Sequence, residues 1–229
     1  MERVRKQMSA QHRFIQNAAH QLRTPLATLS TQASFAERTT CESDRKDVLA
    51  GIKNTTMQLS RLAGQLLTLS RAEPGSRRPR ADRVDLAEAG QQILESLSGK
   101  AFDRKIDLGF ELKATKAIIS GDGTMLREMI VNLVDNALTY TPEGGTVTLV
   151  IDQDGPKIDI RVEDNGPGIP ANEYEHVFER FYRVPGTVAD GSGLGLAIVR
   201  EVADTAGGHV ELSQTKGGGL TVTVTLPAA

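Results

Sequence analysis

Cysteine and long apolar runs are scarce in this sequence of 229 residues. Its one cysteine, Cys41, excludes a disulfide framework and a cysteine-rich metal site, and it fits a reducing compartment. No apolar run approaches the ~20 residues that span a membrane, and the first residues are too polar for a signal peptide. They are typical of the middle of a helix, so we expect the sequence to be part of a longer protein.

An excess of one charge is also lacking, because 27 basic residues face 29 acidic ones and the formal net charge is -2. We therefore expect no nucleic-acid partner. Two familiar signatures are missing too: a G-x-x-x-x-G-K-S/T phosphate loop, and the H-R-D and D-F-G motifs. Their absence excludes a P-loop enzyme and a serine/threonine kinase.

Heptad periodicity is the strongest pattern that is present. It occurs in residues 44–72, where the repeat predicts a coiled-coil seam formed by Val48, Ile52, Thr55, Leu59, Leu62, Leu66 and Leu69. Residues 1–38 predict a second helix with a similar stripe, formed by Met8, Ile15, Ala18, Leu22, Leu29, Ala33 and Ala36. With a turn at 39–43, residues 1–72 form an all-α hairpin, and a homodimer that makes a four-helix bundle would cover its apolar surface.

The composition changes after residue 72. Residues 73–82 break the helix and predict a linker. Residues 83–229 then alternate between helical and strand patterns, which predicts an α/β domain. We expect helices near 86–98, 122–138 and 194–206, and strands near 105–112, 117–119, 145–152, 156–163, 209–213 and 219–226.

Two asparagines on the predicted helix 122–138 are candidates for metal binding. Asn132 and Asn136 are four residues apart, so both project from one face of the helix. An amide oxygen can bind Mg²⁺, whose other ligands are usually water and substrate phosphates. The alternative interpretation is ordinary solvated polarity on a helix.

Two glycine-rich segments follow. Asp164, Gly166 and Gly168 end a strand, where a carboxylate can accept a hydrogen bond from an adenine amino group and glycines let a ligand approach closely. An ordinary turn is the alternative. The second segment opens a helix, where backbone N–H groups bind phosphate, and it contains Gly191, Gly193, Gly195 and Leu196.

In this order the three segments resemble the ATP-binding domain shared by gyrase-type ATPases, heat-shock chaperones, mismatch-repair proteins and histidine kinases, the GHKL superfamily. Residues 177–183, VFERFYR, are similar to the aromatic box of the histidine-kinase branch, with an amphipathic core turn as the alternative. The resemblance implies a two-layer α/β sandwich of the Bergerat type that binds ATP and Mg²⁺.

The resemblance also implies roles for single residues. Asn136 would bind Mg²⁺, Asp164 would recognise adenine, and Gly166 and Gly168 would shape the base pocket. Gly191, Gly193 and Gly195 would form a mobile lid over the phosphates, and either Arg180 or Arg183 would contact them. Tyr140 fits the family pattern, whereas Thr139 replaces a common lysine or arginine. Asn132 stands where the ATP-hydrolysing branches carry an acidic residue, which favours phosphotransfer over hydrolysis.

His20 is the candidate nucleophile. Residues 20–26, HQLRTPL, resemble the phosphoacceptor box H-E-L-R-T-P-L of histidine kinases. Helical geometry turns His20 away from the seam that contains Ala18 and Leu22, so we expect it to be exposed. Gln21 replaces the usual acidic residue that accepts a proton. Thr24 follows one turn later, where related kinases are thought to orient the water that removes phosphate from the partner.

These features together predict the core of a bacterial sensor histidine kinase. We expect ATP-dependent autophosphorylation on His20 and transfer to an aspartate of a response-regulator receiver domain, with a phosphatase activity as a further expectation. This cytoplasmic piece would belong to a protein anchored in the inner membrane through an absent N-terminal region. The alternatives are an ATPase clamp, and a degenerate kinase that only binds or dephosphorylates a regulator.

Overall fold

The computed structural model describes residues 2–72, 82–114, 116–187 and 191–229. The chain divides into two compact units, Met1–Leu67 and Thr68–Ala229. Of the predicted linker 73–82, only Asp82 lies among the described residues, and it begins a strand. The two units are described in turn.

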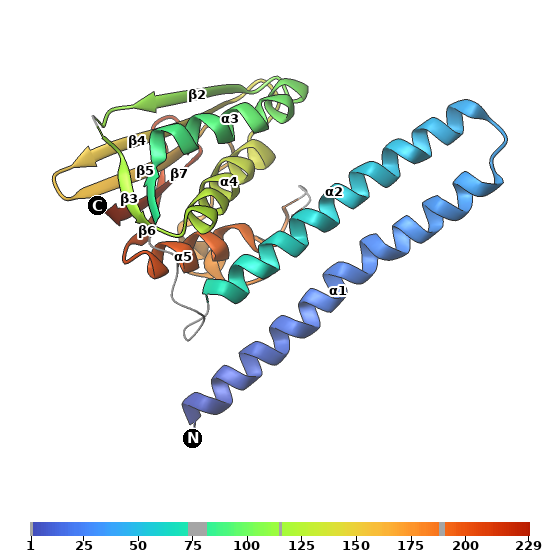
Figure 1. Cartoon of the computed structure of the whole chain (residues 1–229), viewed down its shortest axis with the longest axis horizontal. Coiled ribbons are helices and arrows are strands. Elements are labelled where there is room, and N and C mark those ends of the chain that lie inside the picture. Colours follow the sequence, from blue (N-terminus) through green and yellow to red (C-terminus); the bar gives the residue numbers. More distant parts are fainter. Residues whose placement is uncertain (1, 73–81, 115, 188–190) are drawn as a thin grey trace. The chain divides into compact units, whose positions relative to one another are not determined.

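The first unit is a helical hairpin (Figure 1) formed by α1 (Glu2–Arg38) and all but the end of α2 (Glu42–Ala72). The connection is shorter than predicted, because α2 already begins at Glu42. All seven predicted seam residues of α2 are shielded from solvent, and Thr55, Leu62 and Leu69 are buried.

The predicted stripe on α1 is partly wrong. Ile15 is 57% exposed and Ala33 is also exposed, while the side chain of Met8 lies outside the described residues. The shielded positions are Phe14, Ala18, Leu22, Pro25, Leu29, Gln32 and Ala36. Ile15 and Ala33 each directly follow a member of this stripe, and one residue turns the side chain by about 100° around a helix.

A polar contact fixes the pairing of the two helices. The Gln32 side chain of α1 approaches Gly51 of α2 so closely that a Cβ at Gly51 would lie 2.7 Å from Gln32 Nε2. One turn later, Thr55 Oγ1 lies 3.4 Å from Gln32 Oε1 and donates to the Gly51 carbonyl at 3.0 Å. A glycine opposite a glutamine therefore sets the register of the hairpin.

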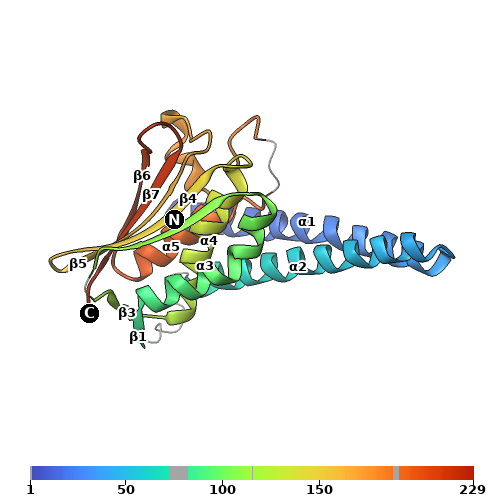
Figure 2. The same ribbon diagram turned by 90° about the horizontal axis from the view of Figure 1, so that it is seen from above.

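The second unit is an α/β sandwich. Its five-stranded sheet has the order β2-β4-β5-β7-β6, in which only the β2–β4 pair is parallel. The strands are β2 (Asp107–Leu112), β4 (Thr146–Asp154), β5 (Lys157–Asp164), β6 (His209–Gln214) and β7 (Leu220–Pro227). One face of the sheet is covered by α3 (Leu86–Asp103), α4 (Gly123–Tyr140) and α5 (Gly195–Thr205), as Figure 2 shows.

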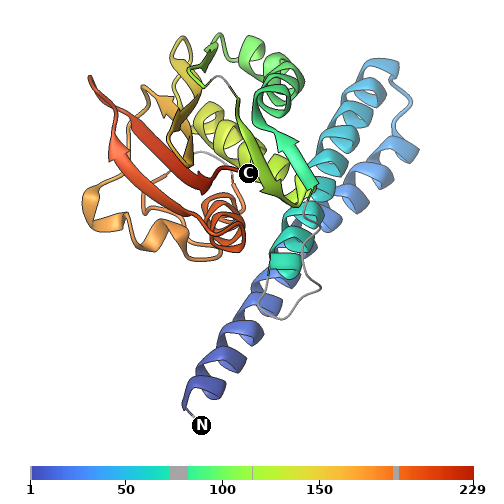
Figure 3. The same cartoon turned by 60° about the vertical axis from the view of Figure 1, so that its left-hand side comes forward.

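Apolar side chains fill the space between these two layers. Along β5, the alternate residues Ile158, Ile160 and Val162 are buried, and Asp164 continues the same face. Figure 3 shows α5 beside the last two strands, β6 and β7. The buried face of β5 therefore leads directly to the candidate base-binding residue.

Capping aspartates set where two of the helices begin. Asp85 accepts hydrogen bonds from the backbone N–H groups of Ala87 and Glu88 at the start of α3. Asp122 does the same for Thr124 and Met125 at the start of α4. Such caps stabilise a helix by ~1 kcal/mol, and the start of α4 fixes the phase in which its asparagines project.

A small second sheet was not predicted. It pairs β1 (Asp82–Asp85) with β3 (Ile118–Gly121) in antiparallel orientation. The two short helices η1 (Ala171–Glu173) and η2 (His176–Phe178) were also missed. The helix predicted at 86–98 continues to Asp103, past Gly99, whose Cβ position faces open space.

Candidate functional site

The candidate nucleophile lies on the hairpin. His20, Gln21 and Thr24 are all exposed on α1, while Leu22 and Pro25 are shielded. The helix continues through Pro25, although proline offers no N–H to the carbonyl four residues before it. His20 and Thr24 are one turn apart on the same face, so a group that docks at His20 also meets the Thr24 hydroxyl.

The two asparagines of α4 have different surroundings. Asn132 is only 1% exposed, and its Nδ2 donates to the Glu128 carbonyl at 2.7 Å. Asn136 is half-buried and lies against the first residue of α5. A Cβ on Gly195 would be 2.6 Å from Asn136 Nδ2 and 2.8 Å from Asn136 Oδ1. The absence of a Cβ at Gly195 therefore leaves the space that the Asn136 amide occupies.

The end of β5 holds a buried carboxylate. Asp164 is 7% exposed, and its Oδ1 accepts hydrogen bonds from the backbone N–H of Gly166 at 2.8 Å and of Leu220 at 3.2 Å. Burial raises the pKa of the Asp164 carboxyl, and these two hydrogen bonds oppose the rise. A Cβ on Gly166 would lie 2.9 Å from the same oxygen. Asp164 is thus held in one orientation at the end of β5.

Sequence reasoning missed the turn between β6 and β7. Gly217, Gly218 and Gly219 all have positive φ, and a Cβ on Gly219 would lie 1.9 Å from the Asp164 carbonyl oxygen. Gly168, with φ of 71°, packs against the Gly219 carbonyl in the same way. Three consecutive glycines before a strand were the available signal, because such a run permits close approach between backbones.

The glycine segment at 191–196 leads into α5. Gly191 packs toward the Tyr140 hydroxyl, which would lie 3.4 Å from a Cβ at that position. The first turn of α5 contains no acidic residue, so the partial positive charge at its N-terminus is not opposed locally. Leu196 is half-buried within this turn. The segment therefore joins Tyr140 and Asn136 of α4 to an N-terminus suited to an anion.

The segment 177–183 contacts both α5 and the glycine segment 191–196. Arg180 Nη2 lies 3.4 Å from Glu201 Oε2, and the guanidinium of Arg200 lies 4.4 Å from the centre of the Phe178 ring. Phe181 has a φ of 69°, rare for an aromatic residue, and its N–H donates to the Gly193 carbonyl at 2.8 Å. A Cβ on Gly193 would lie 2.6 Å from the Phe181 carbonyl carbon.

The two candidate arginines of this segment therefore differ. Arg180 is about 28% exposed and pairs with Glu201. Arg183 is exposed, and its Nη2 donates to the Thr187 carbonyl at 3.4 Å. Nearby, Tyr182 donates its hydroxyl hydrogen to Glu173, and this bond raises the pKa of the Tyr182 phenol.

Mg²⁺ fits these surroundings as an ion held mainly by a nucleotide. No cluster of three or more His, Cys, Asp or Glu side chains suited to a metal occurs within the described parts of the chain. The half-buried Asn136 amide would supply one oxygen, and Mg²⁺ commonly takes one or two protein ligands together with phosphate oxygens and water.

Among residues 2–72, 82–114, 116–187 and 191–229, no helix is long and apolar enough to cross a membrane.

Comparison with known proteins relates both units to one family. Residues 10–75 match the family model of the His Kinase A (phospho-acceptor) domain. Residues 121–229 match the model of the histidine kinase-, DNA gyrase B- and HSP90-like ATPases. A solved mycobacterial sensor histidine kinase, MprB, is 31% identical, with a TM-score of 0.57 over 64% of this chain and 97% of that chain. The chain belongs to the sensor histidine kinases.

Two further relatives cover nearly all of this histidine kinase chain. The sensor protein kinase PmrB of Pseudomonas aeruginosa is 36% identical over 99% of the chain and 48% of the relative. The histidine kinase ThkA, solved in complex with the response regulator protein TrrA, shares the fold at 22% identity, with a TM-score of 0.75 over 98% of this chain and 64% of that chain. The chain spans about half the length of PmrB and of the other curated relatives it matches.

Proposed function

We propose that this chain transfers the γ-phosphate of ATP to His20 and then to an aspartate of a response-regulator receiver domain. The observation that carries the proposal is the contact of Asn136 with Gly195, which joins the asparagine helix to the glycine segment. It brings the proposed metal-binding amide to a helix N-terminus, in the same unit as the buried Asp164, while the exposed His20 stands on the other unit.

In the nucleotide site, Asp164 accepts a hydrogen bond from the adenine amino group. Its Oδ1 already accepts from two backbone N–H groups, which supports Oδ2 as the oxygen that would accept from the base. The N-terminus of α5 and the exposed Arg183 bind the phosphates, while Arg180 fastens its segment to α5. Mg²⁺ held by Asn136 would neutralise phosphate charge that develops during transfer.

At the hairpin, a neutral His20 attacks the γ-phosphorus through Nε2. The N–P bond forms as the bond from the γ-phosphorus to the bridging oxygen breaks, and ADP leaves. The ring then loses its remaining proton to water, because Gln21 is a hydrogen-bonding group and a very poor base. The protein contributes mainly positioning and charge neutralisation, as is usual for phosphoryl transfer.

The receiver domain of a response regulator is the proposed partner. The exposed row of His20, Gln21 and Thr24 gives it an open face of α1. ThkA, which shares the fold, was solved with such a regulator. On the same face, the Thr24 hydroxyl can hold the water that hydrolyses the regulator's aspartyl phosphate, which supports a phosphatase activity.

The hairpin is proposed to dimerise into a four-helix bundle. Six large apolar residues on it are at least half exposed: Ile15, Leu26, Phe35, Leu49, Met57 and Leu67. A second hairpin packed against this one would cover part of these apolar side chains. The curated relatives, which are named as sensor proteins, are about twice as long as this chain, and we further propose that the whole protein is anchored in the inner membrane with this part on its cytoplasmic side.

Labelling with γ-³²P-ATP tests the proposed reaction. The parent protein should acquire an acid-labile, base-stable label, and His20→Ala should abolish it without changing ATP affinity. His12→Ala is the matched control, since His12 is also exposed on α1 but lies outside the motif. Label retained in His20→Ala would contradict the assignment. Rapid release of free phosphate without labelled protein would favour an ATPase clamp instead.

A further inference from the structure

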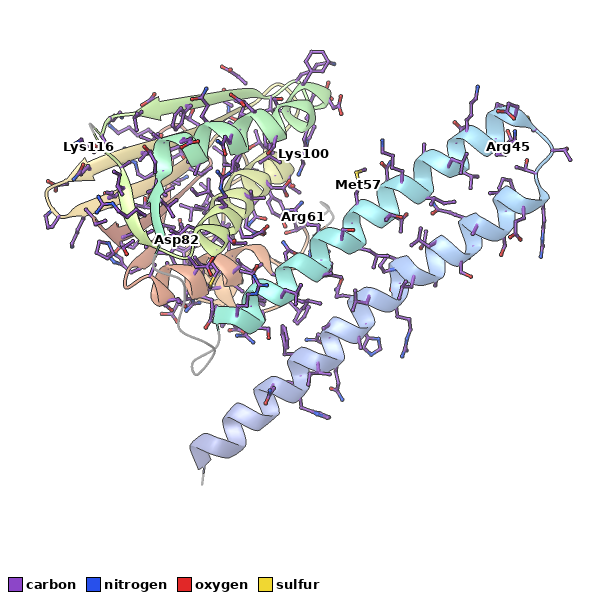
Figure 4. The ribbon with its side chains drawn as sticks, in the orientation of Figure 1. Arg45, Met57, Arg61, Asp82, Lys100 and Lys116 are labelled. Carbon is purple, nitrogen blue, oxygen red and sulfur yellow. The ribbon has the colours of Figure 1, made fainter. Side chains whose placement is uncertain are left out.

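A charge network connects α3 to the C-terminal half of α4. Lys100, in the last turn of α3, places its Nζ 2.7 Å from Asp135 Oδ1 and 2.7 Å from Thr139 Oγ1. The Thr139 hydroxyl in turn donates to the Asp135 carbonyl at 2.7 Å. Figure 4 labels Lys100 where the end of α3 meets α4. None of the recognised motifs contains Lys100.

The carboxylate in this network is the unusual group. Asp135 is 4% exposed and directly precedes Asn136, the proposed Mg²⁺ ligand. A buried carboxylate is costly unless it is paired, and next to a triphosphate it would also repel the ligand. Lys100, with about one third of its side chain exposed, pairs with the Asp135 carboxylate.

The C-terminal turn of α4 contains no basic residue of its own. Its cations come from the end of α3 and the residue that follows it. Lys100 reaches Thr139, and Arg104 donates to the carbonyls of Thr139 and Thr141 at 2.8 and 2.9 Å. Thr139 is also the position where the resemblance led us to expect a lysine or arginine. Its short side chain leaves room for the ammonium of Lys100.

We propose that Lys100 is a positioning and charge-neutralising residue of the nucleotide site, which allows a polyphosphate to bind beside the buried carboxylate of Asp135. The inference rests on the proposed function, because it takes the phosphates to lie near Asn136. Asn136 and Thr139 are neighbours on the helix surface, so the Lys100–Asp135 pair would lie on the order of 10 Å from phosphates bound at Asn136. By Coulomb's law, with an effective dielectric constant of about 20 to 40, loss of one protein charge at that distance changes ligand affinity roughly four- to sixteen-fold for each charge on the ligand.

Binding of adenosine, ADP and ATP at constant Mg²⁺ tests the proposal, measured by displacement of a fluorescent nucleotide. Lys100→Met should weaken ATP at least tenfold, ADP less, and adenosine no more than about threefold. The double variant Lys100→Met/Asp135→Asn should restore ATP binding to within about threefold of the parent. Lys105→Met is the matched control, because it removes a lysine from the exposed ion pair of Lys105 with Glu143. This variant protein should bind all three ligands like the parent.

Asp135→Asn alone keeps the test decisive if Lys100→Met does not fold. It removes the buried negative charge and leaves Lys100, so ATP should bind several-fold more tightly while adenosine is unchanged. Equal loss of adenosine and ATP in Lys100→Met, or unchanged ATP affinity in Asp135→Asn, would overturn the inference. A parent protein that binds no ATP would instead overturn the proposed function.

Discussion

Replacing Gly195 by alanine should separate folding from metal-dependent nucleotide binding. The new Cβ would lie 2.6 Å from Asn136 Nδ2, which is 0.8 Å less than the 3.4 Å at which ordinary contact begins. The atoms in its way are the end of one flexible side chain. The amide of Asn136 can therefore move aside, and the fold is largely preserved.

The expected cost of that movement falls on function. Mg²⁺ requires near-ideal octahedral geometry with oxygens at 2.0–2.1 Å, and a displacement of about 1 Å can cost ~10²-fold. We expect Gly195→Ala to weaken Mg²⁺-dependent ATP binding by one to two orders of magnitude. The free energy of unfolding should change by no more than about 1 kcal/mol, since the helix propensity of alanine offsets part of the strain.

Isothermal titration with ATP, with and without Mg²⁺, and thermal unfolding measure the two effects. Gly99→Ala is the matched control, because its Cβ would meet open space in α3, and it should keep the parent's affinity with equal or slightly higher stability. An unchanged dependence of ATP affinity on Mg²⁺ in Gly195→Ala would refute the assignment of Asn136. A loss of stability of several kcal/mol would show that the amide cannot move aside.

Three other changes test separate parts of the proposal. Asp164→Asn keeps an oxygen for the two backbone N–H groups and removes the buried charge whose desolvation raises the carboxyl pKa. Thermal unfolding near neutral pH should therefore show equal or higher stability, while nucleotide titration should show that selectivity for adenine is lost. Leu26→Asp with Leu67→Asp should give monomers by light scattering, and a monomeric parent at tens of micromolar would contradict the bundle. Gln21→Glu should speed single-turnover labelling about tenfold, and a rate no faster than the parent's would leave Gln21 as an orienting group.

Much of the architecture could be predicted because its signals are local. The heptad repeat of α2 shields the seam residues that the sequence indicated, and the strand expected near 156–163 is found as β5 (Lys157–Asp164). The small β1–β3 sheet escaped prediction because a four-residue strand such as Asp82–Asp85 contains almost no apolar residues. The helix end near 98 was misplaced because Gly99 resembles a terminator, whereas Lys100 and Arg104 bind the last turns of α3 to α4.

The candidate site was also predicted only in part. Motifs indicated the types of residue, but only the structure brings the Gly195 backbone to the Asn136 amide, and Gly219 to the Asp164 backbone. Those contacts join segments about 55 to 60 residues apart, and nothing in the spacing of either segment specifies its partner. The two arginines of the aromatic segment were equally plausible phosphate ligands by sequence, and the ion pair with Glu201 now distinguishes Arg180 from Arg183.

Close backbone contacts and charge pairs differ in how visible they are in a sequence, and the cause is physical. Where a backbone approaches another group closely, a Cβ would collide, so such contacts require glycine at fixed positions in the sequence. Gly195 lies in this way against the Asn136 side chain, and Gly219 against the Asp164 backbone. A charge acts over a longer range and can come from any neighbouring element, so Lys100 neutralises Asp135 without leaving a pattern in either helix. The electrostatic part of a phosphate-binding site is therefore the part that a motif search misses, and the charge-dependent binding series for Lys100 and Asp135 measures it directly.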